Sequence, residues 1–269
     1  GKHVVVALAP GYHGNTLLTL SVGGREHYKK YFRPWLTDVE HLPAPYPYRC
    51  PCRGADPACP RCNGKALEET LLRIGPQNVA AFIAEPVGGS STGGSVPREE
   101  YWRNVRDICT RHEVLWIADE VLTGAGRTGT WSALEPYGVV PDIQVMGKGI
   151  SGGYAPLASV AAPRRIVDVL ARGPKALSHA QTFSHTPMMC AAGVAAIRYL
   201  RKHDLVTRCA EMGRVLHRKL VALRGLPCVG DVRGRGLLAG IEFVQDTESR
   251  APFPRADRFV ERFTAAAEG

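Results

Sequence analysis

The sequence predicts an α/β fold with a mostly parallel central sheet flanked by helices, followed by the start of a smaller α+β domain. Two observations support this prediction. Short apolar runs rich in β-branched residues alternate with helical patterns over the first two thirds of the chain, and such runs are typical of strands buried on both faces. Further along, the pattern changes to a long helix and a glycine-containing hairpin. Strands that alternate with helices favour a parallel sheet with right-handed crossovers.

The individual elements follow from these patterns in chain order. Strands are predicted at 3–9, 79–85, 114–119 and 143–146, with a further strand at 157–162. Helices are predicted at 66–75, 98–112, 187–202 and 205–225, and a hairpin with glycine turns at 229–246. Pro97 marks the start of the second helix, whose acidic residues suit a first turn. We expect a large domain over 1–203, with a Cys- and Pro-rich insertion at about 25–64, and a small domain from 204 to 269.

Composition indicates a globular protein. With 269 residues, 45% of them hydrophobic, the chain can bury a sizeable core. No apolar run approaches the length of a membrane span, and the first residues lack a signal-peptide pattern. We therefore expect a cytoplasmic protein with no membrane partner.

The net charge of +9 raises the question of a nucleic-acid partner. The basic residues are scattered, and no block of five like charges occurs. A small ligand that carries a phosphate accounts for the excess as well as nucleic acid does. We therefore expect a small-molecule ligand and no nucleic acid.

Residues that carry chemistry follow each of the main predicted strands. Tyr12 and His13 come after the first, Glu85 after the second, Asp119 after the third and Lys148 after the fourth. In parallel sheets, ligands bind at the carboxyl ends of the strands. A lysine, a carboxylate, a ring that can stack and backbone donors are what pyridoxal phosphate (PLP) requires. The sequence thus predicts a PLP site at this edge.

Lys148 stands between two glycines in the stretch GKGISGGY. A lysine at the end of a buried strand is a candidate nucleophile, because burial lowers the pKa of the ammonium group. Taken alone, these eight residues favour a solvated loop lysine, so the case for a nucleophile depends on the rest of the chain.

Six segments occur together in one order along the chain: GYHGNTL, FIAEPVGG, ADEVLTGAGRTG (118–129), PDIQVMGKGISGGYAPL (141–157), TFSHTP and VRGRGLLAGIEFV. With this combination the chain resembles the class III (omega) aminotransferases of PLP fold type I over nearly its whole length. The resemblance implies a homodimeric, PLP-dependent transaminase that moves an amino group from an amino acid or amine to a 2-oxo acid through an internal aldimine. The amino donor is left open.

Two alternatives remain beside the transaminase. One is a PLP aminomutase similar to glutamate-1-semialdehyde aminomutase, which shares these motifs. The other is a catalytically inactive, basic or zinc-bearing binding protein on the same scaffold. Because a degenerate scaffold is expected to lose Lys148 or Asp119, and both are present, the enzyme is the better interpretation.

Residue by residue, the resemblance makes Lys148 the lysine that binds the cofactor and moves the proton. Asp119 becomes the carboxylate that keeps the pyridine nitrogen protonated, since a nearby anion favours the charged form. A helix N-cap is the structural alternative for Asp119. Val121 and Tyr12 would pack on the two faces of the cofactor ring, although either fits an ordinary core position equally well.

Three further positions match the family with plainer alternatives beside them. Glu85 corresponds to a glutamate near the polar edge of the cofactor, or to an ordinary strand-terminal acid. Thr182 corresponds to the threonine that reaches the phosphate of the neighbouring subunit's cofactor, or to a simple turn threonine. His13 is as well explained by a structural histidine as by a role near the ring.

The chain also departs from the family. Leu122 stands where some relatives carry glutamine, and Ala125 replaces an aromatic residue in GAGRTG. The family's phosphate loop and its arginine for the substrate carboxylate have no counterpart in the sequence. We therefore expect a fragment that lacks both ends and, alone, binds PLP weakly.

Eight cysteines complete the set of candidate residues. Four of them, Cys50, Cys52, Cys59 and Cys62, form a C-x-C and C-x-x-C arrangement that can hold a tetrahedral zinc ion. Similar enzymes carry loose cysteines in this insertion, and cytosolic thiols need not bind anything, so no metal is assigned. The other four, Cys109, Cys190, Cys209 and Cys228, fit small buried apolar positions.

Overall fold

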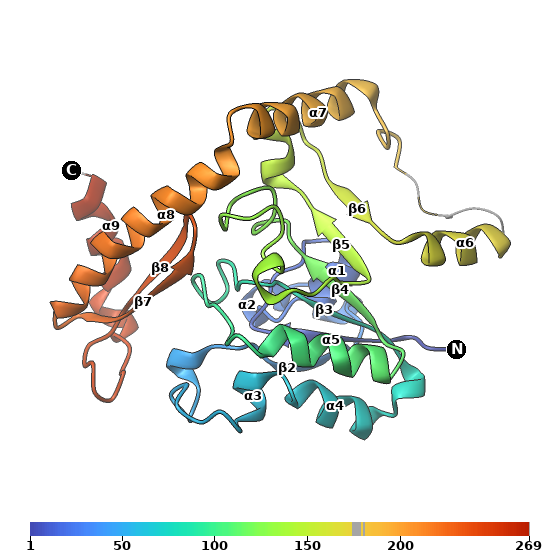
Figure 1. The fold of residues 1–269 in the computed structure, drawn as a ribbon. Coiled ribbons are helices and arrows are strands. Elements are labelled where there is room, and N and C mark those ends of the chain that lie inside the picture. The colour runs from blue at the N-terminus through green and yellow to red at the C-terminus, as the bar shows by residue number, and fades with distance from the viewer. Residues whose placement is uncertain (174–178, 180, 269) are drawn as a thin grey trace.

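The computed structural model describes residues 1–173, 179 and 181–268, and its centre is a six-stranded sheet of order β2-β1-β3-β4-β5-β6 (Figure 1). The strands are β1 (Val4–Ala9), β2 (Glu40–Pro43), β3 (Val79–Ala84), β4 (Leu115–Asp119), β5 (Ile143–Met146) and β6 (Ser159–Ala161). The pairs from β2 to β5 are parallel, and β6 is antiparallel to β5. The predicted mostly parallel sheet is confirmed.

Helices flank this sheet and extend beyond it. They are α1 (Leu17–Val22), α2 (Glu26–Lys29), α3 (Pro60–Asn63), α4 (Ala66–Ile74), α5 (Tyr101–Arg111), α6 (Arg164–Arg172), α7 (Pro187–Lys202), α8 (Leu205–Val221) and α9 (Phe259–Glu268). The helices α4 and α5 cover one side of the sheet, whereas α6 and α7 lie beyond β6 (Figure 1). Within the described ranges, no helix has the length and apolar character needed to cross a bilayer.

The main core lies between the sheet and the helices α4 and α5. The side chains of Trp102 on α5 and Trp116 on β4 are fully buried, and their rings stack with centroids 5.3 Å apart. Buried residues recur on one face of α5, as expected for an amphipathic helix. The Nε1 atom of Trp102 donates a hydrogen bond to the carbonyl of Pro86 at 2.9 Å. This contact fixes the backbone directly after β3, next to the candidate site residue Glu85.

Two details of the predicted elements are wrong. Helix α5 begins at Tyr101 rather than next to Pro97, and its first turn holds no acidic residue. The preceding residues form a separate turn, in which the N–H of Tyr101 donates to the carbonyl of Arg98. The short elements β2, α1, α2, α3, α6 and α9 were not predicted. The strand β2 is an example, because its parallel pairing with β1, rather than its own apolar pattern, defines it.

The cysteines outside the insertion are only partly as predicted. Cys109 and Cys209 are buried, but Cys228 is half-buried and Cys190 is exposed. The prediction is wrong for Cys190 because α7 leaves most of its side chains uncovered, with Gly193 its one buried residue.

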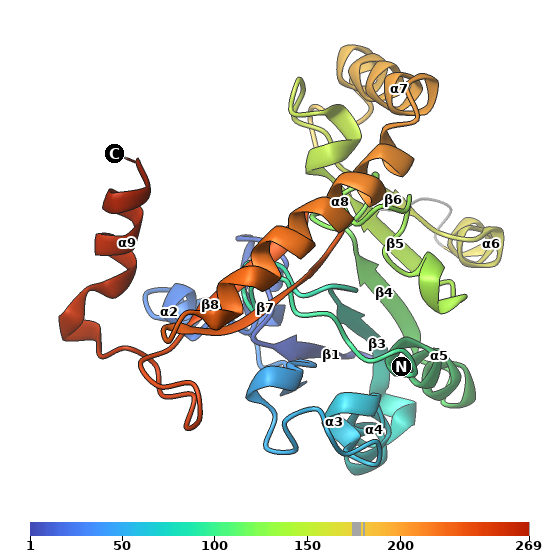
Figure 2. The same cartoon turned by 60° about the vertical axis from the view of Figure 1, so that its left-hand side comes forward.

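A second sheet follows α8 and contains the antiparallel strands β7 (Val229–Arg235) and β8 (Leu238–Phe243). This confirms the predicted hairpin. Figure 2 shows α8 lying along it. The turn residue Gly236 has a φ of +58°, and a Cβ added to Gly213 of α8 would come within 2.6 Å of it. The N–H of Leu237 donates to the carbonyl of Arg127 at 3.0 Å. The domain boundary predicted after residue 203 falls between α7 and α8 and stays a prediction.

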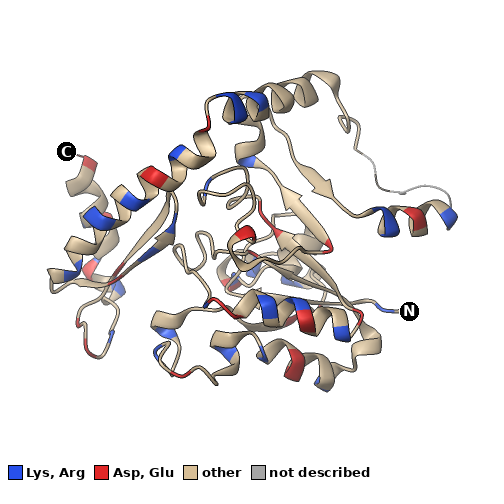
Figure 3. Ribbon diagram, viewed as in Figure 1, with Lys and Arg blue, Asp and Glu red and all other residues tan. Residues whose placement is uncertain are grey.

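Charged residues of both signs share the helices. Lys and Arg lie along α5, α6 and α8 with Asp or Glu among them (Figure 3). Pairs such as Arg103 with Glu99 and Arg164 with Asp168 are four residues apart on or next to a helix. Such pairs are typical of solvated helix faces.

Candidate functional site

The candidate site is assembled by the pairing of adjacent parallel strands. Ala84 of β3 pairs with Ala118 of β4, so that Glu85 and Asp119 leave the sheet side by side. Asp119 in turn pairs with Val145 of β5, shortly before Lys148. The carboxyl ends of β1, β3, β4 and β5 therefore bring the predicted residues to one edge, as expected for this type of sheet.

Asp119 and His13 form a buried pair at this edge. The Nδ1 atom of His13 lies 2.8 Å from Oδ2 of Asp119, and the two side chains are 1% and 9% exposed. Because an ionised carboxylate only accepts hydrogen bonds, His13 donates from Nδ1. The other oxygen of Asp119 accepts the N–H of Val121 at 3.1 Å. The hydrogen bonds from His13 and Val121 thus hold the Asp119 carboxylate in one orientation.

The second ring nitrogen of His13 is left without a partner. Its Nε2 atom is buried and has no hydrogen bond within the described part of the chain. Unpaired buried polar atoms are uncommon in folded proteins and often mark a site for a ligand or water.

Glu85 is held close to this pair by the backbone of two glycine-rich loops. Its carboxylate accepts the N–H of Tyr12 at 3.3 Å and the N–H of Gly89 at 3.2 Å. Burial raises the pKa of Glu85 above its usual value; His13 and the two N–H donors oppose this rise, and the charge of Asp119 adds to it. The site therefore contains two carboxylates in different environments.

Lys148 begins a short 3₁₀ helix at the end of β5 and has a φ of +42°. For a residue other than glycine this left-handed conformation costs about 1–3 kcal/mol, and such strain clusters at functional sites. Its side chain is exposed. The expectation of a buried lysine is therefore wrong, because every residue of β5 stays partly exposed and the flanking glycines have no side chains to cover it.

Val121 and Ala125 lie beside the two glycines that flank Lys148. A Cβ added to Gly147 would lie 3.3 Å from Cγ1 of Val121, and one added to Gly149 would lie 3.4 Å from Cβ of Ala125. Lys148, Leu122 and Ala125 line a cavity of 220 Å³. Of the two departures from the family pattern, Leu122 puts an apolar side chain where some relatives have glutamine, and Ala125 puts a small side chain where the family has an aromatic ring.

Tyr12 and Thr182 complete the predicted set, in different ways. The guanidinium of Arg25 lies 5.1 Å from the centroid of the Tyr12 ring, and Tyr28 packs edge-on at 6.0 Å. Thr182 lies in an exposed turn before α7. None of the hydrogen bonds between described residues joins its side chain to the rest of the set, so the structure does not bring it into this group.

Glu120, directly after Asp119, is a buried structural residue whose role the sequence did not reveal. It is 1% exposed, and its carboxylate accepts hydrogen bonds from Thr123, Ser132, the N–H of Ala133 and Gln144. These contacts anchor the loop that follows Asp119. Its partners come from separate parts of the chain, so no local pattern distinguishes this glutamate from a surface acid.

Comparisons with known proteins show the family of this chain. A family model described as aminotransferase class-III matches residues 1–267. The chain belongs to the class III aminotransferase family.

Individual relatives are similar over almost the whole chain. An uncharacterised aminotransferase of Schizosaccharomyces pombe is 39% identical over 93% of this chain and 55% of its own length. The putrescine–pyruvate aminotransferase of Pseudomonas aeruginosa is 35% identical over 94% of this chain and 55% of its own length. An amine transaminase from an uncultivated Pseudomonas species, solved in a PLP-bound form, superimposes with a TM-score of 0.89 at 36% identity, covering 95% of this chain and 59% of the other. The chain spans a little over half the length of these relatives.

The raised pKa of Glu85 predicts a pH-dependent loss of stability. In the folded state the carboxyl group binds its proton more tightly than in the unfolded state, where the reference pKa is 4.5. The free energy of unfolding therefore falls as the pH rises from the unfolded pKa through the raised folded pKa. Without added cofactor, the wild type should lose stability relative to Glu85→Gln over this range in denaturant titrations.

The exposed Glu113→Gln is the matched control, and its stability should follow that of the wild type. If the difference between the wild type and Glu85→Gln were constant with pH, the raised pKa of Glu85 would be wrong.

Proposed function

We propose that the protein is a PLP-dependent transaminase that transfers an amino group from an amino acid or amine to a 2-oxo acid. One observation carries the proposal: the His13–Asp119 pair, Glu85 and Lys148 follow four adjacent parallel strands at one edge of the sheet. Membership of the class III family and the PLP-bound relative support it.

The side chains at this edge fit the chemistry of PLP. Asp119 keeps a free lone pair on each oxygen after its two hydrogen bonds, so it can accept from a protonated pyridine nitrogen. Val121 and Tyr12 offer an aliphatic and an aromatic surface for the ring. Lys148 offers a primary amine to an aldehyde carbon. When bound, PLP supplies an electron sink for the negative charge that develops at the substrate Cα.

The residues of this chain then have separate tasks. Asp119 stabilises positive charge at the pyridine nitrogen, an electrostatic effect that strengthens in a site with little water. His13 is a positioning residue, because its 2.8 Å hydrogen bond orients the Asp119 carboxylate. The Nζ atom of Lys148 removes the proton from the substrate Cα and holds it for return. Its solvent-exposed position leaves the side chain free to move between these roles.

A homodimer in the cytoplasm belongs to the same proposal. Apolar side chains are exposed near the predicted inter-subunit residue Thr182: Phe183 is 82% exposed and Met188 of α7 is 70% exposed. Tyr154, a few residues after Lys148, is 92% exposed. Apolar surface of this kind marks an interaction site. A second copy of the chain is the occupant we propose, because it would bring Thr182 to the neighbouring cofactor.

Lys148 should carry the cofactor. In the complete protein loaded with PLP, borohydride reduction followed by peptide mapping should place a pyridoxyl group on the peptide that contains GKGISGGY. Lys148→Ala should abolish transamination, whereas Lys219→Ala, an exposed lysine of α8, should leave it unchanged. A pyridoxyl group on another lysine, or turnover by Lys148→Ala, would refute the assignment.

Asp119→Asn should keep the fold and impair catalysis. The amide oxygen still accepts from His13, but it provides no negative charge for the pyridinium. We expect the rate to fall about a hundredfold or more. The measurement is kcat of each variant and of the wild type, with the same amino donor and the same 2-oxo acid. Asp107→Asn, at an exposed position of α5, is the control. Wild-type turnover by Asp119→Asn would show that the carboxylate does not stabilise the cofactor.

Shared active sites should allow complementation between two defective variants. A hybrid of Lys148→Ala and Thr182→Ala subunits contains one complete site, with lysine from one subunit and threonine from the other. If Thr182→Ala alone is strongly impaired, a fully exchanged equimolar mixture should recover about a quarter of the wild-type activity. Gel filtration verifies the dimer. Native mass spectrometry verifies the subunit exchange, because the hybrid dimer has its own mass. Failure to recover activity in proven hybrids would contradict site sharing.

A further inference from the structure

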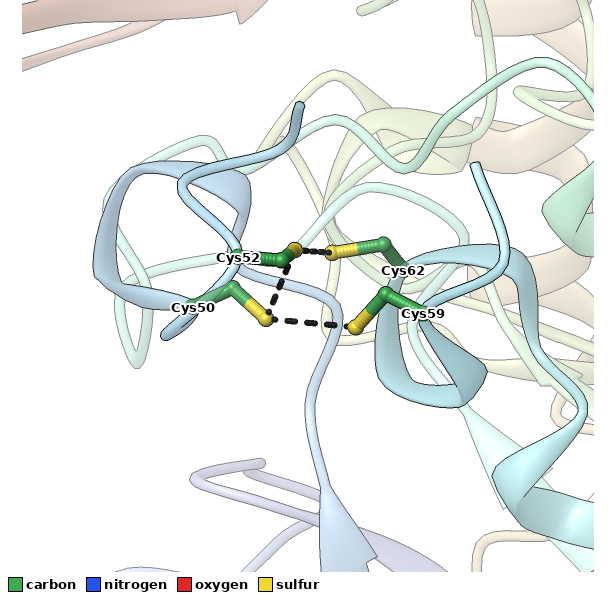
Figure 4. A group of neighbouring side chains, drawn as sticks. All are labelled: Cys50, Cys52, Cys59 and Cys62. Carbon is green, nitrogen blue, oxygen red and sulfur yellow. Dashed lines mark hydrogen bonds between the residues drawn. The ribbon is translucent and has the colours of Figure 1, made fainter. Parts of the chain in front are cut away.

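The four cysteines of the insertion converge in the fold. Cys50, Cys52, Cys59 and Cys62 point their sulfur atoms at one another from two sides (Figure 4), and all four sulfurs lie within 4.8 Å of each other. Three of the distances are 3.6 Å for Cys50 to Cys59, 3.3 Å for Cys50 to Cys52 and 3.4 Å for Cys52 to Cys62. The C-x-C and C-x-x-C pairs thus form one compact cluster.

These distances match a single tetrahedral metal ion. With Zn–S bonds of about 2.3 Å, the sulfurs of a four-cysteine zinc site lie about 3.8 Å apart. A disulfide requires about 2.05 Å between its sulfurs, and all four cysteines are free thiols. An iron–sulfur cluster of four irons attaches each cysteine to a different iron and holds the cysteine sulfurs farther apart.

The backbone presents the sulfurs on two turns. Cys59 caps α3, and the N–H groups of Cys62 and Asn63 donate to its carbonyl. On the other side, the N–H of Arg53 donates to the carbonyl of Cys50, in a turn where Arg53 has a φ of +51°. Because hydrogen bonds already fix both turns, little ordering remains for a metal to impose.

The charge around the cluster suits a metal–thiolate centre. One Zn²⁺ ion with four thiolates has a net charge of −2. The segment from 49 to 65 contains Arg49, Arg53, Arg61 and Lys65, with Asp56 as its one acidic residue. The guanidinium of Arg98 joins them by donating to the carbonyl of Gly54 at 3.1 Å. The positive charges of this segment offset the negative charge that a metal–thiolate centre would carry.

We propose that Cys50, Cys52, Cys59 and Cys62 bind one zinc ion. Since the protein supplies all four ligands, the site is closed and its role is structural. The zinc ion fixes Cys50, the residue directly after Arg49. The guanidinium of Arg49 forms an ion pair with Glu242 of β8 at 2.5 Å. Tyr46 donates to the same carboxylate. The zinc ion therefore stabilises the attachment of the β7–β8 hairpin to the large sheet's edge, independently of the transaminase chemistry.

Metal analysis of the complete protein tests the proposal. The untagged protein, expressed with added zinc and purified by gel filtration without chelator, should contain about one zinc ion per chain. The double variant Cys59→Ser/Cys62→Ser should lose this zinc, whereas Cys190→Ser, at an exposed position outside the cluster, should keep it. Zinc far below one per chain in the wild type, or iron in its place, would overturn the proposal.

A cobalt titration decides the question even if the double variant does not fold. Wild-type protein is reduced, stripped with a chelator and titrated with Co²⁺. Intense thiolate-to-cobalt bands with a tetrahedral d–d pattern should saturate at about one equivalent, and Zn²⁺ should abolish them. Zinc should also raise the unfolding temperature of the stripped protein. Absent bands would refute the site, as would a mass that shows two disulfides in protein purified under reducing conditions.

Discussion

Parallel pairing of β1, β3, β4 and β5 is the constraint on which the site depends. Because the strands run in one direction, each chain segment leaves the sheet at the same edge, and residues far apart in sequence meet there. A register shift of one residue would turn the side chains at this edge to the opposite face. The stacked Trp102 and Trp116 rings help to hold this register, since they join α5 to β4.

The two carboxylates at this edge show how environment separates residues of similar chemistry. Asp119 has a histidine and a backbone N–H as partners. Glu85 has two backbone N–H groups as partners, and its burial raises its pKa. A site for a cationic ring nitrogen needs one anion at a defined point, which Asp119 can provide. A second carboxylate nearby, Glu85, repels Asp119 less when its raised pKa favours the neutral form.

A second set of interactions connects the insertion, the glycine-rich loop and the β7–β8 hairpin. Arg233 of β7 forms an ion pair with Glu242 at 2.7 Å and donates to the carbonyl of Thr92, in the loop after Glu85. Tyr46 and Arg49 reach the same glutamate from the segment before Cys50. The partly buried carboxylate of Glu242 therefore connects the hairpin with the loop beside the candidate site and with the segment that leads to the cysteine cluster. Its cationic partners keep this buried charge paired.

The sequence by itself determined the α/β class, the four main strands, the α7 bounds, the hairpin and the family, because buried strands and local motifs leave patterns in neighbouring residues. It also named the residues that follow the strands. Only the tertiary structure decided how these residues meet: His13 against Asp119, Glu85 under two N–H groups, Glu120 as an anchor, and an exposed Lys148. It also brought four sulfurs of the insertion together. Burial and partners depend on segments distant in sequence, so no local pattern encodes them.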